Sequence, residues 1–129
     1  MMDDRVKELL LMGSSARSVG KILDNYENSQ MYFIETFPEI DPTAVIAYKK
    51  EADTLEILDI AVDPDYRGQG LGSIMIKGMI TRNCPAKVVA ETDDDAVGFY
   101  RKLGFSASPF DSKWGIVRYS LELDCANQP

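Results

Sequence analysis

The sequence predicts an α/β fold in which a mixed central sheet carries helices on both of its faces. Apolar residues alternate between helical and strand spacing in the order α-α-β-β-β-α-β-α-β-β. One strand leads through a glycine-rich loop into a helix, and another strand follows that helix directly. Two strands joined through one helix form a βαβ unit, so these two strands are expected to be parallel. With 129 residues, we expect a single domain over residues 1–129.

The first half of the chain predicts two helices followed by three strands. Helical spacing covers residues 3–12, and Gly13 is expected to end this helix. Ser14 or Ser15 is expected to cap a second helix, and the polar residues 25–29 predict a turn. Strands are expected at 30–37, 43–49 and 55–62. The third strand is apolar on both faces apart from Glu56 and Asp59, which is typical of a central strand.

The second half predicts two further helices and three further strands. The helix after the glycine loop runs to about Asn83, with these residues expected to face inward: Leu71, Ile74, Met75, Met79 and Ile80. A short strand is expected at 87–91, and Thr92 or Asp93 is expected to cap a helix that ends at Gly104. Two closing strands at 105–110 and 115–123 complete the sheet.

Composition excludes several classes of function. The chain contains no histidine, which removes Ser-His-Asp triads, histidine zinc sites and a histidine base. A net charge of −7 argues against nucleic-acid binding, and it suits a cationic partner such as an amine as well as simple solubility. Two cysteines form neither a disulfide framework nor a metal-ligand pair, so no metal is expected. Without an apolar membrane span or a signal-peptide pattern, we expect no membrane partner and a cytoplasmic location.

The glycine-rich loop at residues 67–73 predicts a site for a pyrophosphate. Glycines allow a ligand to approach the backbone closely, and the first N–H groups of a helix have no partner within the helix. A phosphate-binding P-loop would need lysine after its last glycine, whereas Ser73 follows Gly72 here. The dinucleotide fingerprint also fits poorly, because the spacing is Gly-x-Gly-x-Gly and the loop lies in the middle of the chain.

The loop resembles motif A of the GNAT superfamily of acyl-CoA N-acyltransferases, Arg/Gln-x-x-Gly-x-Gly/Ala, through Arg67, Gly70 and Gly72. Residues 93–105 resemble motif B of the same family, Asn-x-x-Ala-x-x-Phe/Leu-Tyr-x-x-x-Gly-Phe. The resemblance spans about Glu56 to Phe105.

Two features depart from the family pattern. Asp93 replaces the asparagine of motif B, so its side chain can cap a helix but cannot donate an amide hydrogen bond to the cofactor. The family strand that precedes the first helix is missing here, which predicts a sheet edge that is open or paired with another chain. A homodimer is one expected consequence.

The resemblance implies transfer of an acetyl group from acetyl-CoA to a primary amine by direct attack, without a covalent enzyme intermediate. In such a site the loop backbone binds the pyrophosphate, and a strand edge binds the pantetheine arm where two parallel strands separate. The residues expected to bind acetyl-CoA are Ile60, Ala61, Val62, Arg67, Gly68, Gln69, Gly70, Leu71, Gly72, Ser73 and Asp93.

Two catalytic residues are implied by the same resemblance. Tyr100 matches the family tyrosine that protonates the leaving thiolate. Glu56 lies six residues before Val62, where histone-acetylating members carry their catalytic glutamate, and is the expected base. Glu91, Glu35 or a chain of water molecules are the alternatives. Strand alternation predicts that Glu56 and Asp59 face opposite sides of the sheet.

The identity of the acceptor is not encoded in a motif. A small amine, a polyamine and a lysine or N-terminal amine all satisfy the resemblance. The alternative function is a degenerate acyl-CoA-binding sensor or interaction module without turnover. Transfer to an oxygen, or of an acyl group larger than acetyl, is a third interpretation.

Overall fold

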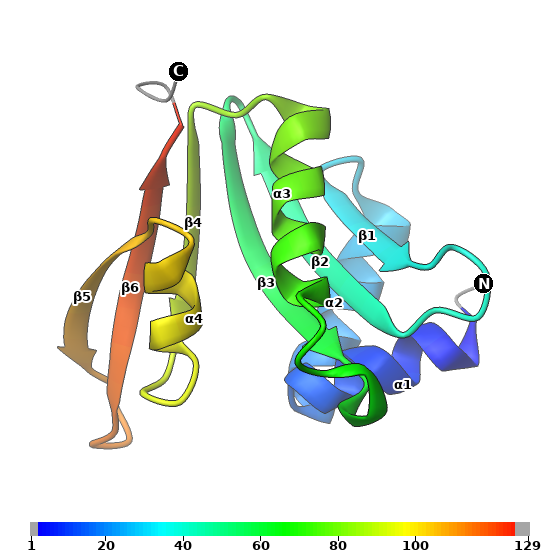
Figure 1. Cartoon of the computed structure of the whole chain (residues 1–129), viewed down its shortest axis with the longest axis horizontal. Coiled ribbons are helices and arrows are strands. Elements are labelled where there is room, and N and C mark those ends of the chain that lie inside the picture. Colours follow the sequence, from blue (N-terminus) through cyan, green and yellow to red (C-terminus); the bar gives the residue numbers. More distant parts are fainter. Residues whose placement is uncertain (1–2, 126–129) are drawn as a thin grey trace.

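The computed structural model describes residues 3–125 as a six-stranded mixed sheet with helices on both faces (Figure 1). The predicted order of helices and strands is confirmed, with one additional 3-10 turn before the glycine-rich loop. The elements are, in chain order, α1 (Asp4–Gly13), α2 (Ala16–Asn28), β1 (Tyr32–Phe37), β2 (Ala44–Glu51), β3 (Thr54–Val62), η1 (Pro64–Tyr66), α3 (Leu71–Asn83), β4 (Lys87–Thr92), α4 (Val97–Lys102), β5 (Ser106–Asp111) and β6 (Val117–Asp124).

The strands lie in the spatial order β1-β2-β3-β4-β6-β5. The pair β3–β4 is parallel, as the βαβ unit predicts, and the other neighbouring pairs are antiparallel. Strand β1 pairs only with β2, so among residues 3–125 its outer edge is open. The expected uncovered sheet edge is therefore present in this part of the chain.

Strands β3 and β4 are paired only over their first residues. Their register runs from Thr54 opposite Lys87 to Glu56 opposite Val89 and then stops, although β3 continues to Val62 and β4 to Thr92. Figure 1 shows the two strands adjacent at one end and diverging toward the other. The sheet therefore opens in its middle, on the side where β3 leads into the glycine-rich loop.

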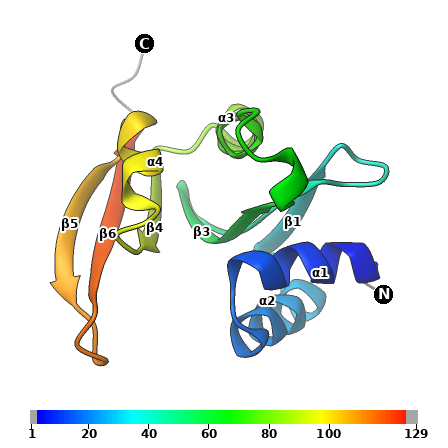
Figure 2. The ribbon, with the colours of Figure 1, turned by 60° about the horizontal axis from the view of Figure 1, so that its bottom comes forward.

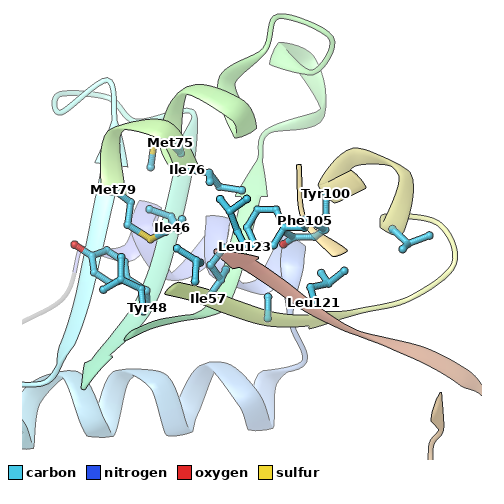
Figure 3. Close-up of a cluster of buried hydrophobic side chains, with 14 of the residues drawn as sticks. Ile46, Tyr48, Ile57, Met75, Ile76, Met79, Tyr100, Phe105, Leu121 and Leu123 are labelled. Carbon is cyan, nitrogen blue, oxygen red and sulfur yellow. The ribbon is translucent and has the colours of Figure 1, made fainter. Parts of the chain in front are cut away.

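Two apolar clusters hold the two faces of the sheet. Helices α1 and α2 cover one face and α3 covers the other (Figure 2). The larger cluster packs α3 and α4 against the sheet through Tyr48, Met79, Tyr100 and Leu121, among others (Figure 3). The smaller cluster packs Leu9 and Leu10 of α1 and residues of α2 against Val45, Ala47 and Ala61. The larger cluster takes residues from β2, β3, β4 and β6 and so bridges the two halves of the separated sheet, whereas the smaller cluster involves only β1, β2 and β3.

Three local predictions were wrong. Residues 25–28 belong to α2 rather than to a turn, and the Asn28 amide extends the helix by donating to the Asp24 carbonyl at 2.8 Å. On α3, Ile74 is 48% exposed whereas Ile76 is buried, because the face toward the sheet is formed by Met75, Ile76 and Met79. Helix α4 begins only at Val97, after a turn in which the Asp93 carboxylate accepts a hydrogen bond from the Ala96 N–H at 3.0 Å.

The register between β2 and β3 shifts by one residue in the middle of β3. Ala47 lies opposite Asp59 while its neighbour Tyr48 lies opposite Ile57, so Leu58 is an extra residue in β3. An extra residue in a strand reverses the side of the sheet that each following side chain faces. Glu56 and Asp59 therefore share one face of the sheet, and the expectation that they face opposite sides was wrong.

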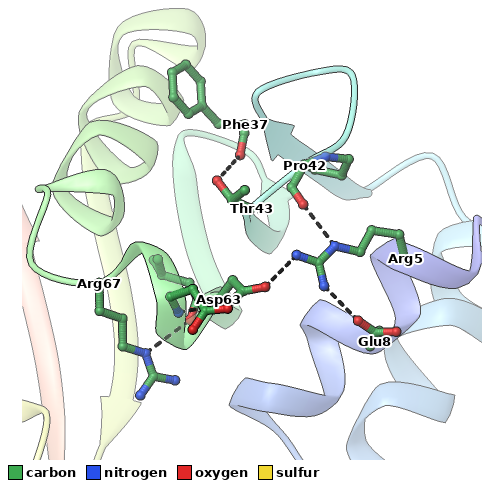
Figure 4. A network of polar contacts seen from close by, with 9 residues as sticks. Arg5, Glu8, Phe37, Pro42, Thr43, Asp63 and Arg67 are labelled. Atoms are coloured by element: carbon green, nitrogen blue, oxygen red, sulfur yellow. Dashed lines mark hydrogen bonds and ion pairs between the residues drawn. The ribbon is translucent and has the colours of Figure 1, made fainter.

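A polar network ties α1 to the end of β3 (Figure 4). The Arg5 guanidinium donates to the Pro42 carbonyl at 3.0 Å and pairs with the carboxylates of Asp63 and Glu8, each at 2.6 Å. The Arg5 hydrogen bond is the main reason that the pKa of Asp63 is lowered, and the Asp65 N–H adds to it. These contacts fix α1 beside the segment that leads into the glycine-rich loop.

The end of α1 approaches β3 so closely that only glycine fits at position 13. A Cβ atom there would overlap the Asp59 carboxylate and lie 2.9 Å from the Ile60 carbonyl oxygen. We expect Gly13→Ala to lower the free energy of unfolding by about 1–3 kcal/mol, as overpacking commonly does. Urea unfolding measures this difference.

Gly20→Ala is the matched control, since Gly20 lies within α2 with no atom near the added methyl group. It should raise the free energy of unfolding by up to about 1 kcal/mol through helix propensity. Equal stabilities for the two variants would contradict the close approach of α1 to β3.

Candidate functional site

The glycine-rich loop has the backbone conformation that favours glycine at two positions. Gly68 has φ +83° and Gly70 has φ +79°, and Gly70 is the N-cap of α3. The first backbone bond of the helix is donated by Ile74 to the Gly70 carbonyl at 3.0 Å. The N–H groups of residues 71–73 therefore have no partner within α3, and together with the positive end of the helix dipole they favour an anion.

Gly72 brings the two sequence motifs into contact. A Cβ atom at this position would lie 3.1 Å from the Phe99 ring, so the absent side chain lets the first turn of α3 pack against α4. The glycine loop and the aromatic residues of α4 thus form one site.

A cavity of about 440 Å³ lies between the end of β3, the glycine loop and α4. It is mainly apolar and is lined by Met12, Gly13, Ile60, Ala61, Val62, Tyr66, Arg67, Gly68, Gly70, Leu71, Gly72, Ser73, Ala96, Phe99 and Tyr100. Most of the residues expected to bind a cofactor are among them. Gln69 and Asp93 do not line this cavity, and the Asp93 side chain is instead engaged in the turn before α4.

The segment from Ile60 to Val62 has a strand partner on one side only. These residues pair with Ile46, Val45 and Ala44 of β2, while β4 has already separated from β3. The Arg67 side chain donates to the Val62 carbonyl at 3.1 Å (Figure 4), which holds the loop against this strand end. The free edge of β3 is therefore available to an extended ligand in the cavity.

Tyr100 is one of the residues that line this cavity. It is buried, and its ring makes edge-to-face contacts with Phe99 and Phe105 at centroid distances of 5.1 Å and 5.4 Å. Burial, reinforced by the negative charges of Asp59 and Asp93, raises the pKa of Tyr100 to about 12. The phenol therefore stays protonated at neutral pH and can act as a proton donor.

A second, more polar cavity of about 250 Å³ occupies the gap between β3 and β4. It shares Gly13, Ile60, Ala96 and Tyr100 with the first cavity, so the two cavities adjoin at these residues. The remaining lining residues are Ser14, Ile57, Leu58, Asp59, Glu91, Thr92, Asp93 and Arg118. One elongated site thus has an apolar arm beside the glycine loop and an acidic arm between the strands.

Asp59 is the unusual group of the second cavity. Its side chain belongs to a residue that is only 4% exposed, and neither carboxylate oxygen has a hydrogen-bond partner within residues 3–125. Burial raises its pKa from an ordinary 3.8 to about 7, and the neighbouring Ser14 offsets this only in part. In the sequence, Asp59 is an acidic residue within an apolar strand, and this position was the one indication that it could be a site residue. The sequence did not indicate that its carboxylate is buried at the site.

The other candidate bases occupy different places. Glu56 is exposed and lines a separate pocket beside Lys49 and Glu51, outside both cavities that contain Tyr100. Glu35 lies on β1, where it accepts a hydrogen bond from the Tyr48 hydroxyl at 2.6 Å and pairs with Arg82. Glu91 lines the second cavity. The structure therefore brings Asp59 and Glu91 together with Tyr100, but neither Glu56 nor Glu35.

Known proteins resemble this chain over the same elements. A family model described as an acetyltransferase (GNAT) domain matches residues 27–107. Histone acetyltransferase TAP1 of Glycine max is 41% identical over 56 residues, which are 41% of this chain and 24% of that protein. The chain spans between 22% and 37% of the length of the curated relatives it matches.

Solved structures share the fold over nearly the whole chain. The ribosomal-protein-S18-alanine N-acetyltransferase of Escherichia coli superposes with a TM-score of 0.76 at 18% identity, covering 99% of this chain and 93% of its own. A Bacillus subtilis acetyltransferase solved in complex with CoA gives a TM-score of 0.75 at 18% identity, covering 96% and 93%.

Two further observations concern the described residues alone. No helix within residues 3–125 has the length and apolar character required to cross a membrane. Cys84 and Cys125 are both free thiols, and the same residues contain no cluster of three or more potential metal ligands.

The raised pKa of Asp59 predicts a specific dependence of stability on pH. Because the folded state holds this proton up to about pH 7 and the unfolded state releases it near 3.8, the parent loses stability as pH rises between these values. The free energy of unfolding of Asp59→Asn minus that of the parent should therefore increase as pH rises. We expect an increase of up to about 4 kcal/mol from pH 4 to pH 8. Urea unfolding of both proteins at several pH values tests this, and parallel curves would contradict it.

Proposed function

This chain belongs to the GNAT acetyltransferase family, and we propose that it transfers an acetyl group from acetyl-CoA to a primary amine by direct attack. The observation that carries the proposal is the pair of cavities that meet at Tyr100, one beside the glycine loop and one between the separated strands. A direct transfer needs two substrates to reach one point from different sides. The two arms of this site provide that arrangement.

The first cavity suits acetyl-CoA, which supplies the acetyl group as a thioester. The backbone N–H groups at the start of α3 hold the pyrophosphate, and Gly68 and Gly70 keep the approach to them open. Arg67, at the cavity wall, adds positive charge for the phosphates. The free edge of β3 from Ile60 to Val62 binds the pantetheine arm by backbone hydrogen bonds.

Tyr100 acts as the acid in this proposal. The leaving thiolate of CoA needs a proton, and the phenol retains its proton at neutral pH because its pKa is raised to about 12. The contacts of the ring with Phe99 and Phe105 fix its position at the junction of the two cavities. Proton transfer then occurs where the apolar arm ends.

The acceptor enters from the acidic arm. Carboxylates of Asp59, Glu91 and Asp93 line this cavity, together with one cation, Arg118. An excess of negative charge favours an ammonium group over a neutral or anionic acceptor. The similarity to a histone acetyltransferase of Glycine max supports including amines of proteins in the acceptor class. The open edge of β1 offers backbone groups to a second copy, and a homodimer is part of this proposal.

Thermal unfolding with and without acetyl-CoA tests the proposal first. A ligand at 100 times its Kd stabilises the folded state by about 2.7 kcal/mol. For a chain of this length we expect the midpoint to rise by roughly 5–10 °C. NADH and ATP serve as control ligands, and an equal rise with either would contradict selective binding of acetyl-CoA.

Gly70→Val is the companion variant, because φ +79° strains any residue with a branched side chain. It should lose the response to acetyl-CoA, while Gly20→Ala should retain it. A normal response of Gly70→Val would remove the loop from the binding site. A response of the parent without acetyl transfer to any amine would favour the sensor function.

Tyr100→Phe separates binding from catalysis. The phenylalanine ring keeps the packing against Phe99 and Phe105 but cannot donate a proton, so we expect turnover to fall by about 10²–10⁴-fold. The thermal response to acetyl-CoA should remain within about 2 °C of the parent. Unchanged turnover between pH 6 and 9 would show that Tyr100 is not the acid.

A further inference from the structure

Asp59 combines three properties that no other carboxylate of residues 3–125 shares. It is 4% exposed, both of its oxygens lack a hydrogen-bond partner, and it lines the cavity that continues to Tyr100. A buried carboxylate without a partner costs free energy that a structural role would not require. A cationic ligand in the second cavity would supply the missing partner.

The placement of Asp59 results from two long-range features. The extra residue Leu58 turns Asp59 to the same face as Ala47, and the absent side chain of Gly13 leaves the space that its carboxylate occupies. The carboxylate thus lies beneath the end of α1, and Asp59 is one of the residues that line the cavity between β3 and β4. Its surroundings contribute Tyr100 from α4, Glu91 from β4, Asp93 from the following turn and Arg118 from β6.

Glu56 has none of these properties. Its side chain is exposed, it lies at the last paired position of β3 and β4, and its charge acts on Lys49 rather than on Tyr100. A base must be within hydrogen-bond reach of the proton it removes, directly or through one water. Asp59 is among the residues that line the second cavity, whereas Glu56 is not.

We propose that Asp59, rather than Glu56, takes the proton from the acceptor amine, and that the acceptor presents an aliphatic ammonium group through the cavity between β3 and β4. This inference rests on the proposed acetyl transfer. A volume of about 250 Å³ admits an unbranched ammonium-bearing chain, while any bulkier part of the acceptor remains outside. The burial that holds the pKa of Asp59 near 7 makes it an effective proton acceptor at neutral pH.

The proton balance is complete with these residues. The ammonium gives one proton to the Asp59 carboxylate, and the freed nitrogen lone pair forms the C–N bond to the acetyl carbon as the C–S bond breaks. Tyr100 gives its proton to the sulfur, and the second proton of the nitrogen restores the phenol. The products are the amide, the thiol and one proton, which Asp59 releases to solvent.

Acetyl transfer to n-butylamine by the parent, Asp59→Asn and Glu56→Gln tests this assignment. Both variants replace a carboxylate with an amide of the same shape. We expect kcat/KM of Asp59→Asn to fall by about 100-fold or more, while Glu56→Gln stays within threefold of the parent. Hydroxylamine, which is largely unprotonated at neutral pH, should restore much of the rate in Asp59→Asn. A loss of less than threefold in Asp59→Asn, or an equal loss in Glu56→Gln, would overturn the proposal.

A second measurement follows Asp59 in the parent and needs no turnover. Carbon-13 NMR of the aspartate carboxyl groups follows Asp59 in the parent, with its signal assigned by its absence in Asp59→Asn. The signal should titrate near neutral pH and shift on adding n-butylammonium chloride but not n-butanol. Titration in the ordinary aspartate range, or an equal response to both probes, overturns the proposal.

The two proposals fail in distinguishable ways. An absent thermal response of the parent to acetyl-CoA removes the acetyl transfer and leaves the ammonium response of Asp59 to be judged by NMR. A normal response to acetyl-CoA with Asp59→Asn as active as the parent removes only the role of Asp59.

Discussion

The early end of hydrogen bonding between β3 and β4 is the constraint on which the rest of the site depends. A parallel pair normally continues along both strands, yet here it stops at Glu56 and Val89. Backbone groups left without a strand partner in the interior cost free energy unless water or a ligand satisfies them. The separation therefore creates both the free edge of β3 and the space in which two cavities meet at Tyr100.

The separated sheet is held from its two faces, and the larger apolar cluster bridges the separation through residues of β2, β3, β4 and β6. Strands β2 and β3 are held on one face by α1 and α2, and the Arg5 network fixes α1 to the end of β3 (Figure 4). Strands β4 and β6 contribute to the larger cluster together with α3 and α4 (Figure 3). Helix α3 contacts the sheet through this same cluster, so its N-terminus stays aligned with the opening while the strands diverge.

The pKa values of Tyr100 and Asp59, which both line the opening, are raised. Burial raises the pKa of both groups, and the charge of Asp59 adds to the increase at Tyr100. One group thereby keeps its proton at neutral pH, whereas the other can gain or lose one. The proposed roles of Tyr100 as acid and Asp59 as base depend on this difference between their pKa values.

Local sequence patterns determined the order of the elements, the glycine loop at the start of α3 and the place of Tyr100 on α4, because each depends on residues close together in the chain. Packing between distant segments decided which face of α3 is buried and which carboxylate lies at the opening. Ile76 rather than Ile74 is buried, because Ile76 packs into the larger apolar cluster between α3 and the sheet. Asp59 rather than Glu56 reaches the opening because one extra residue in β3, set by pairing with β2, reverses the alternation. Gly13 leaves room for that carboxylate because α1, distant in sequence, approaches β3 there. The register of a strand and the approach of a helix are properties of pairs of segments, which explains why the sequence alone did not place Asp59 at the opening.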